Sequence, residues 1–196
     1  YAAQNSGSKS FATGGIGGVH RGQVFDISAD LNALAENPAV VVCAGAKSIL
    51  DLAATLEALD TRGVPILGFR TSEFPAFYTR NSGLPVDCSV DEPGEVVEIA
   101  RAHWNAGHRS AVLVVNPIPE VDALDSDLIE KAIKEAISDA DENGISGAAL
   151  TPYLLDRVNQ VSEGKSLKAN LALLRNNAML AGQIAAHFSP SNLISY

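Results

Sequence analysis

The stretch VVVCAGAKSILDLAATLEALDTRG, residues 40–63, indicates the fold class of this chain. Its first four residues are apolar and mostly β-branched, as in a buried β-strand. After a Cys-Ala-Gly-Ala turn, Leu52, Leu56 and Leu59 recur at helical spacing, and Gly63 is a typical helix end. We therefore predict a strand followed directly by a helix that opens at Lys47, which is the repeating unit of α/β proteins.

The rest of the chain continues this alternation of strand-like and helix-like segments. Residues 64–69 and 111–115 are strand-like apolar runs, and Asp91, Asp125 and Thr151 stand where helix N-caps are expected. We predict helices over residues 91–107, from 125 to near 144, over 151–164 and from 166 onward. The prediction is an α/β fold: one three-layer α/β/α domain, residues 1–196, with a central, largely parallel or mixed sheet and a helical C-terminal third.

Composition and charge exclude several classes of function. The 196 residues include 14 Lys plus Arg against 23 Asp plus Glu, a net charge of −9, whereas nucleic-acid binding needs a cationic surface. No apolar run approaches the roughly 18 to 20 residues of a membrane span. Cys43 and Cys88 stand in no metal-ligand spacing, which favours reduced thiols in an intracellular protein. We expect a cytoplasmic protein that binds neither nucleic acid nor membrane.

A glycine-rich segment, FATGGIGGVHRG over residues 11–22, is the first candidate for ligand binding. Its four glycines in five positions allow backbone N–H groups to approach a phosphate or carboxylate closely. A purely structural loop is an equally common use of such glycines. His20 and Arg21 favour the ligand-binding interpretation because they add hydrogen-bond donors and positive charge.

The next segment, FDISADL, spaces Asp26, Ser28 and Asp30 two residues apart. On an extended chain these side chains share one side, where two carboxylates and a hydroxyl suit sugar hydroxyls or a hard cation such as Mg²⁺ or Mn²⁺. The alternative is that Ser28 and Asp30 are ordinary N-cap residues of a helix that starts with LNALAENP.

Lys47 is the candidate nucleophile. Burial and a helix N-terminus both disfavour an ammonium group, so we expect a lowered pKa, and a neutral lysine amine can form an imine with a carbonyl. The alternative is a lysine that reaches solvent or binds phosphate as a fixed cation.

Taken together, these segments resemble the pseudouridine-5'-phosphate glycosidase family, also called the indigoidine synthase A-like family. The resemblance extends from about Phe11 to about Ala186 and rests on motifs that occur in the family's order: FATGGIGGVHRG, FDISADL, VVVCAGAKSILDL, LEALDTRGVPILGF, EFPAFYTRNSG, NPIPE, TPYLLDRV and SLKANLALLRNNA.

The resemblance implies an enzyme with an established type of chemistry. The family reversibly cleaves the C–C glycosidic bond of pseudouridine 5'-phosphate to uracil and ribose 5-phosphate, with Mn²⁺ and a lysine imine, as a homotrimer. Lys47 matches the imine lysine and Asp26 the metal position. The substrate-binding positions are matched by Thr13, His20, Ser28, Ala29, Asp30 and Asn170. Asn170 shares a helical stripe with Leu174 and Asn177, where its amide could meet a uracil edge or bond neighbouring backbone.

Two departures from the family leave alternatives open. The family's N-terminal region, with a glutamate proton donor and a second substrate-binding lysine, is not reproduced by YAAQNSGSKS, and the stretch between His20 and Asp26 is shorter than in the family. We therefore expect a domain that is incomplete at its N-terminus. One alternative is a catalytically impaired, truncated relative that acts as a ligand-binding or oligomerisation module, and another is a different imine-forming lyase of phosphosugars.

Overall fold

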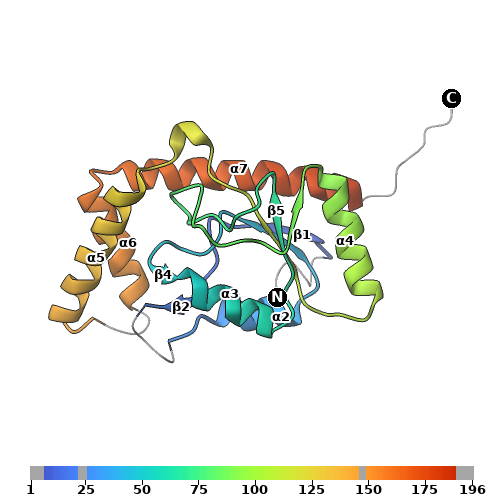
Figure 1. Cartoon of the computed structure of the whole chain (residues 1–196), viewed down its shortest axis with the longest axis horizontal. Coiled ribbons are helices and arrows are strands. Elements are labelled where there is room, and N and C mark those ends of the chain that lie inside the picture. The colour runs from blue at the N-terminus through green and yellow to red at the C-terminus, as the bar shows by residue number, and fades with distance from the viewer. Residues whose placement is uncertain (1–6, 22–25, 146–148, 189–196) are drawn as a thin grey trace.

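A parallel β-sheet lies at the centre of the molecule (Figure 1). The computed structural model describes residues 7–21, 26–145 and 149–188. All neighbouring strands of the five-stranded sheet are parallel. In spatial order these strands are β1 (Ser10–Ala12), β3 (Val40–Cys43), β7 (Val112–Val115), β5 (Ile66–Phe69) and β6 (Cys88–Val90). A separate antiparallel ribbon pairs β2 (Val19–His20) with β4 (Leu50–Asp51).

Both faces of the sheet are covered by helices, so the predicted three-layer α/β/α architecture is confirmed. Along β3, Val40 and Val42 belong to one hydrophobic cluster, and Val41 and Cys43 belong to the other. The first cluster includes side chains of α4 (Pro93–Asn105) and α7 (Lys165–Phe188). The second includes side chains of α2 (Ala29–Glu36), α3 (Leu52–Thr61), α5 (Ser126–Glu142) and α6 (Leu150–Val161).

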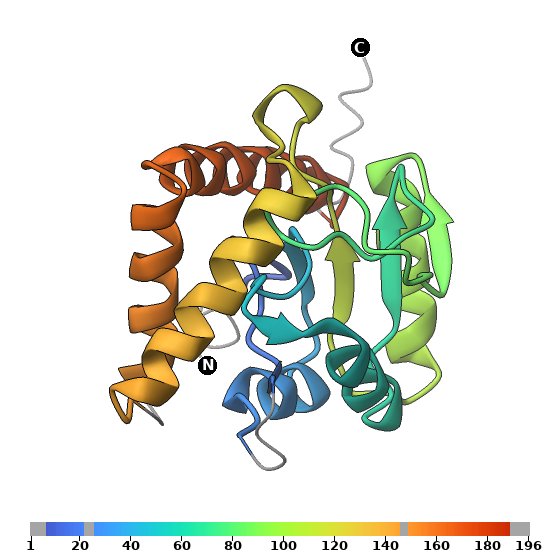
Figure 2. The same ribbon diagram turned by 60° about the vertical axis from the view of Figure 1, so that its left-hand side comes forward.

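The helical C-terminal third is also confirmed (Figure 2). A short 3-10 helix, η1 (Glu120–Asp122), leads from β7 into α5, whose N-cap is Asp125 as predicted. Ile129 and Ile133, placed on the apolar face of this helix by their spacing, are buried. Helices α5 and α6 pack against each other, and α7 crosses from them to the sheet, where it contacts β1, β3 and α4.

The predicted start of the helix at Lys47 is wrong. Helix α3 begins at Leu52, and its N-cap is Asp51, whose Oδ1 accepts a hydrogen bond from the N–H of Ala54 at 2.9 Å. Leu50 and Asp51 form β4 instead, because β2 supplies them with a strand partner. Lys47 therefore precedes the helix by a turn and a strand.

Three other predicted helix starts shift by one or two residues. Helix α4 is capped by Glu92, not by Asp91, because Glu92 and Glu95 form a reciprocal capping box. Thr151 lies inside α6, whose N-cap is Ala149, and α7 begins at Lys165 rather than at residue 166.

The free cysteines differ in environment. Burial raises the pKa of the Cys43 thiol to about 12, which leaves it protonated and unreactive at neutral pH, whereas Cys88 is exposed.

Within the described ranges, no helix has the length and apolar character needed to cross a membrane.

A stacked imidazole pair lies at the C-terminal end of α4. The rings of His103 and His108 are 4.6 Å apart and nearly parallel, and His103 Nε2 lies 2.8 Å from Ser110 Oγ. Burial, and next the neighbouring His108, lower the pKa of His103 below its ordinary value of 6.5. Between the lowered value and 6.5 the unfolded chain binds more protons than the folded protein, so protonation favours unfolding there.

The stability contribution of His103 is therefore complete above pH 6.5 and is lost as the pH falls through its lower folded-state pKa. We expect the free energy of unfolding to fall more steeply between about pH 7.5 and about pH 5.5 in the wild type than in His103→Gln. Urea titrations at both pH values measure this difference, and parallel pH slopes for the two proteins would contradict it.

Candidate active site

Two loops meet at the carboxyl edge of the sheet, beyond the ends of β1 and β3. Ala44 donates its N–H to the carbonyl of Gly14 at 2.8 Å, and Ile16 donates to the carbonyl of Gly45 at 3.0 Å. The N–H of Lys47 then bonds to the carbonyl of Ile16 at 3.1 Å. The glycine-rich loop and the segment that carries Lys47 thus run side by side, at the edge where parallel α/β sheets bind their ligands.

A buried asparagine of α7 holds the glycine-rich loop in place. Asn177, fully buried, donates its side-chain amide to the carbonyls of Thr13 and Gly14 at 2.8 and 3.3 Å. Its Oδ1 accepts from the side-chain amide of Asn116 at 3.1 Å, and the backbone N–H of Asn116 bonds to the carbonyl of Cys43 at 2.8 Å. Sequence reasoning missed Asn116, although its position directly after the strand β7 is a usable signal.

We expect Asn177→Leu, which keeps the number and branching of the side-chain heavy atoms, to lower the free energy of unfolding by about 3 kcal/mol. The substitution leaves the carbonyl of Thr13 and the amide of Asn116 without their partner and removes the longer of two bonds to the carbonyl of Gly14. The neighbouring Asn176 makes one side-chain bond, to the carbonyl of Pro117 at 3.1 Å, so Asn176→Leu should cost only about 1 kcal/mol. Chemical denaturation measures both, and equal losses would contradict the special role of Asn177.

Asn170 lies beside the same loop. A Cβ atom built on Gly14 would lie 3.2 Å from Asn170 Oδ1, and the Asn170 side chain is half-buried. The structure thus brings Asn170 next to Thr13 and Gly14, while its contact with a base stays a prediction. Asn177, on the same stripe, faces the protein interior instead.

The glycine-rich loop also packs closely on the start of α2. Asp30 Oδ2 accepts the N–H of Gly17 at 2.7 Å, and the N–H of Ser28 bonds to the carbonyl of Gly18 at 2.9 Å. A Cβ atom on Gly17 would lie 2.1 Å from Ser28 Oγ, so only glycine fits there. Close packing within the protein therefore explains this glycine, and the N–H of Gly17 is already bound to Asp30.

Ser28 has the role of the helix-cap alternative, whereas Asp30 lies in the first turn of α2 and its carboxylate binds Gly17. Ser28 is the N-cap of α2, and its Oγ accepts from the N–H of Asp30 at 3.2 Å. Ala29 is the first residue of the helix. These roles fix residues 28–30 against the glycine-rich loop, and their contact with a substrate stays a prediction.

Asp26 is the residue best suited to hold a divalent cation. It is half-buried, and its carbonyl accepts the N–H of His20 at 3.0 Å, which anchors its backbone to β2. In the part of the chain that the structure describes, no three His, Cys, Asp or Glu residues gather as a metal cage. A single carboxylate offers oxygen ligands of the kind that Mn²⁺ and Mg²⁺ prefer, and the role of Asp26 as a metal ligand stays a prediction.

His20 and Arg21 are both engaged within the protein. His20 Nε2 lies 3.3 Å from Thr151 Oγ1 of α6, and the imidazole is half-buried. The Arg21 guanidinium bonds to both carboxylate oxygens of Glu130 at 2.9 and 3.1 Å, so its charge is neutralised. The expectation that Arg21 provides charge for an anion is therefore wrong, because Glu130 already takes that place.

Lys47 occupies the first position of a turn, closed by a 3.0 Å bond from the N–H of Leu50 to the carbonyl of Lys47. Its side chain is half-buried, and it takes part in none of the ion pairs found among the described residues. Its side chain thus lies between a buried strand and solvent, without a carboxylate partner in that part of the chain.

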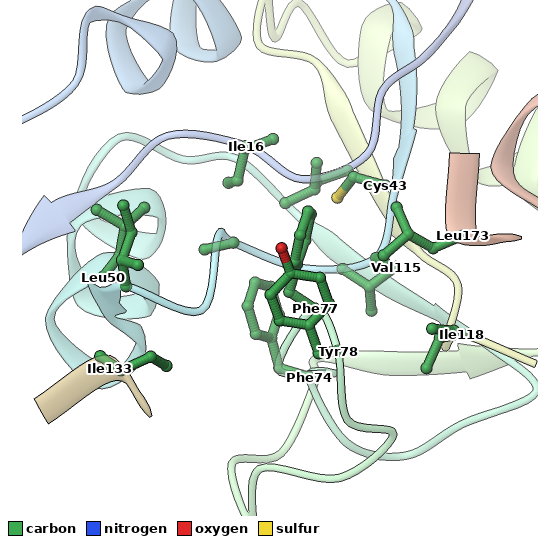
Figure 3. Packing of buried hydrophobic residues seen from close by; sticks show 14 of the residues in the cluster. Ile16, Cys43, Leu50, Phe74, Phe77, Tyr78, Val115, Ile118, Ile133 and Leu173 are labelled. Atoms are coloured by element: carbon green, nitrogen blue, oxygen red, sulfur yellow. The ribbon is translucent and has the colours of Figure 1, made fainter. Parts of the chain in front are cut away.

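Aromatic side chains pack against the segment that leads from β3 to Lys47 (Figure 3). Phe74, Phe77 and Tyr78 are buried between the ends of the central strands and the ribbon strand that contains Leu50. The N–H of Phe77 bonds to the carbonyl of Ala44 at 3.1 Å, and burial raises the pKa of Tyr78. The wall below the Lys47 turn is therefore apolar and uncharged at neutral pH.

Comparison with known proteins identifies relatives over almost the whole chain. The family model described as indigoidine synthase A like protein matches residues 1–187. A pseudouridine-5'-phosphate glycosidase of Caldanaerobacter subterraneus is 56% identical over 189 residues, which are 95% of this chain and 62% of that protein. The chain thus spans about 62% of the length of this curated relative.

Two crystal structures share the fold. The prealnumycin C-glycosynthase AlnA, in complex with ribulose 5-phosphate, is 41% identical with a TM-score of 0.88, and the match covers 94% of this chain and 62% of AlnA. An indigoidine synthase A-like protein of Thermotoga maritima is 39% identical with a TM-score of 0.88, and the match covers 95% of this chain and 62% of the other.

Proposed function

Because this chain belongs to the indigoidine synthase A-like family, we propose that it is the part of a pseudouridine-5'-phosphate glycosidase that carries the imine-forming lysine. The reaction is the reversible cleavage of pseudouridine 5'-phosphate to uracil and ribose 5-phosphate. The observation that carries the proposal is the position of Lys47, half-buried at the carboxyl edge of the sheet and without an ion-pair partner among the described residues.

The chemistry follows from an amine at this position. The neutral Lys47 amine adds to the C1 aldehyde of open-chain ribose 5-phosphate, and loss of water leaves a C=N bond in place of C=O. Protonation of this imine makes C1 an electron sink, to which the C5=C6 electron pair of uracil can add, forming the C–C bond while the C=N electron pair returns to nitrogen. Loss of the C5 proton then restores the uracil ring, and the sugar's O4 hydroxyl bonds to C1 as the Lys47 amine leaves with the hydroxyl proton, which closes the ribose ring. Cleavage is the reverse, with a proton returned to C5 of uracil.

Two similarities support this substrate class. The relative from Caldanaerobacter subterraneus is named for pseudouridine 5'-phosphate, and the structural neighbour AlnA is a C-glycosynthase that binds ribulose 5-phosphate. One relative is thus named for a C-nucleoside phosphate, and the other for C-glycoside synthesis and a bound pentose phosphate. The proposed substrate contacts are Thr13 and His20, within the glycine-rich loop, and Asn170 and residues 28–30, which lie beside it.

The proposed metal is Mn²⁺, with Mg²⁺ or another divalent cation as a substitute, held by Asp26 together with Asp30. When bound, it would supply positive charge for phosphate and hydroxyl oxygens of the sugar. We expect Asp26→Ala to abolish Mn²⁺ binding without changing the thermal transition, since Asp26 is bonded through its backbone. Calorimetric titration with Mn²⁺ measures this, with the remote Asp141→Ala as a control. Unchanged affinity in Asp26→Ala would contradict the metal assignment.

Product formation tests the proposed function. The chain, incubated with uracil, ribose 5-phosphate and Mn²⁺, should form pseudouridine 5'-phosphate, detectable by mass spectrometry. Ribose 5-phosphate binding without product or covalent capture would instead favour the alternative of a binding module that lacks the chemistry.

We also propose a homotrimer, as the family resemblance implies. Leu167, Leu171 and Met179 expose large apolar side chains along α7, which supports a subunit contact there. Light scattering at micromolar concentration checks this, and a monomer mass would contradict it.

A further inference from the structure

One guanidinium group joins the turn that carries Lys47 to a distant helix. Arg21 follows β2, and its Nη1 bonds to both carboxylate oxygens of Glu130 on α5 at 2.9 and 3.1 Å. Its Nη2 donates to the carbonyl of Ser48 at 3.0 Å, and its Nε donates to the carbonyl of Leu50 at 3.1 Å. Both carbonyls belong to the turn and strand directly after Lys47.

These bonds add to the packing of a turn whose Ile49 and Leu50 side chains belong to the hydrophobic core. Ser48, Ile49 and Leu50 are all buried, yet Ser48 Oγ has no hydrogen-bond partner among the described residues. The turn is held by backbone bonds at its two ends, from Lys47 to Ile16 and from Leu50 to Lys47. Arg21 adds two side-chain bonds from outside the turn, to the carbonyls of Ser48 and Leu50, which follow Lys47 in the chain.

The geometry requires arginine rather than any cation. The planar guanidinium presents its N–H donors as a rigid fork, and here all three nitrogen atoms donate to fixed acceptors. A lysine ammonium is a point charge on a flexible stem and cannot meet Glu130 and both carbonyls in the same way. Glu130, by binding Nη1 through both of its oxygens, sets the plane of the fork.

The pair contributes little to global stability. The side chains of Arg21 and Glu130 are 29% and 43% exposed, and water screens ion pairs at such exposure. The energetic role of the pair is therefore small, while its geometric role at the Lys47 turn is specific. These two effects can be separated by experiment.

We propose that Arg21 is a positioning residue for Lys47 and that Glu130 orients Arg21 for this role. The inference rests on the proposed function, in which Lys47 forms an imine with ribose 5-phosphate. The position of the amine matters because a small misplacement of a reacting atom costs far more in rate than in binding.

The test compares Arg21→Lys with Arg157→Lys, whose carboxylate partner Asp139 lies on α5 as Glu130 does. Arg157 donates through Nε to Asp139 Oδ2 and through Nη1 to Gln160, and none of its hydrogen bonds among the described residues reaches the Lys47 turn, so this variant alters an arginine ion pair elsewhere. The measurement is the rate of reductive capture of ribose 5-phosphate on Lys47, with cyanoborohydride, as a function of sugar concentration. We expect Arg21→Lys to lower the maximal rate about tenfold with the half-saturating concentration nearly unchanged, and Glu130→Gln to lower it less.

The control should capture sugar at the wild-type rate. Wild-type rates in Arg21→Lys, or equal losses in Arg21→Lys and Arg157→Lys, would overturn the positioning role. If the wild type captures no sugar on Lys47, the proposed function itself fails.

A second measurement tests how firmly the Lys47 turn is held in the absence of sugar. Amide hydrogen exchange at Leu50, whose N–H closes the turn on Lys47, should be faster in Arg21→Lys and unchanged in Arg157→Lys. Unchanged exchange at Leu50 in Arg21→Lys would overturn the positioning role, whatever the outcome of the capture experiment.

Discussion

Replacing Gly45 by alanine should lower the free energy of unfolding by at least about 3 kcal/mol. Gly45 has φ +88°, a left-handed backbone conformation that residues with a side chain rarely adopt. A Cβ atom there would also lie 2.0 Å from the carbonyl oxygen of Pro75, which is backbone and cannot rotate away. The substitution must therefore displace the segment that leads to Lys47 or the loop that packs against it.

Gly63 provides the matched control for this prediction. It has φ +64°, but no heavy atom lies within 4 Å of the Cβ position, so Gly63→Ala carries the conformational cost without the collision. We expect that cost to be about 1 kcal/mol. Urea unfolding measures both variants. Equal losses would show that the contact between Gly45 and Pro75 is not rigid.

Replacing Lys47 should remove covalent capture of ribose 5-phosphate altogether. Lys47→Ala lacks the amine, while Lys47→Arg keeps a cation of similar reach that cannot form an imine with the sugar aldehyde. We expect both variants to lose the reduced adduct, at least about a hundredfold below wild type, and Lys47→Arg to retain noncovalent binding. Capture is followed by intact mass after reduction.

The arginine variant separates the two interpretations of Lys47. A lysine that serves only as a phosphate-binding cation would give no imine in the wild type, and Lys47→Arg would then bind the sugar phosphate as well as the wild type does. Lys9→Ala, at an exposed position, is the control for capture by surface lysines.

Local sequence patterns are sufficient to predict those helices and strands whose apolar residues recur at helical spacing or form a continuous run. The strand at residues 40–43 and the helix α5, with Ile129 and Ile133 on its inner face, follow directly from such patterns. The strand β6 was missed because its residues Cys88 and Ser89 are exposed, so it contains no apolar run.

The candidate site was predictable in its residue types but not in its contacts. The helix start was misplaced at Lys47 because Leu50 and Asp51 pair with β2, a contact between segments that are distant in the sequence. The same limit applies to Arg21, whose partner Glu130 lies 109 residues away, and to Asn177, which binds Thr13. Such contacts arise only when the fold brings two distant segments together, so the spacing of apolar residues within one segment does not predict them.

The most direct test of the imine chemistry is peptide mapping of the wild-type chain after borohydride reduction in the presence of ribose 5-phosphate. We predict a single reduced pentose phosphate, on the peptide that contains Lys47. Adducts spread over the exposed lysines and absent from Lys47 would contradict the proposal; those lysines are Lys9, Lys131, Lys134, Lys165 and Lys168.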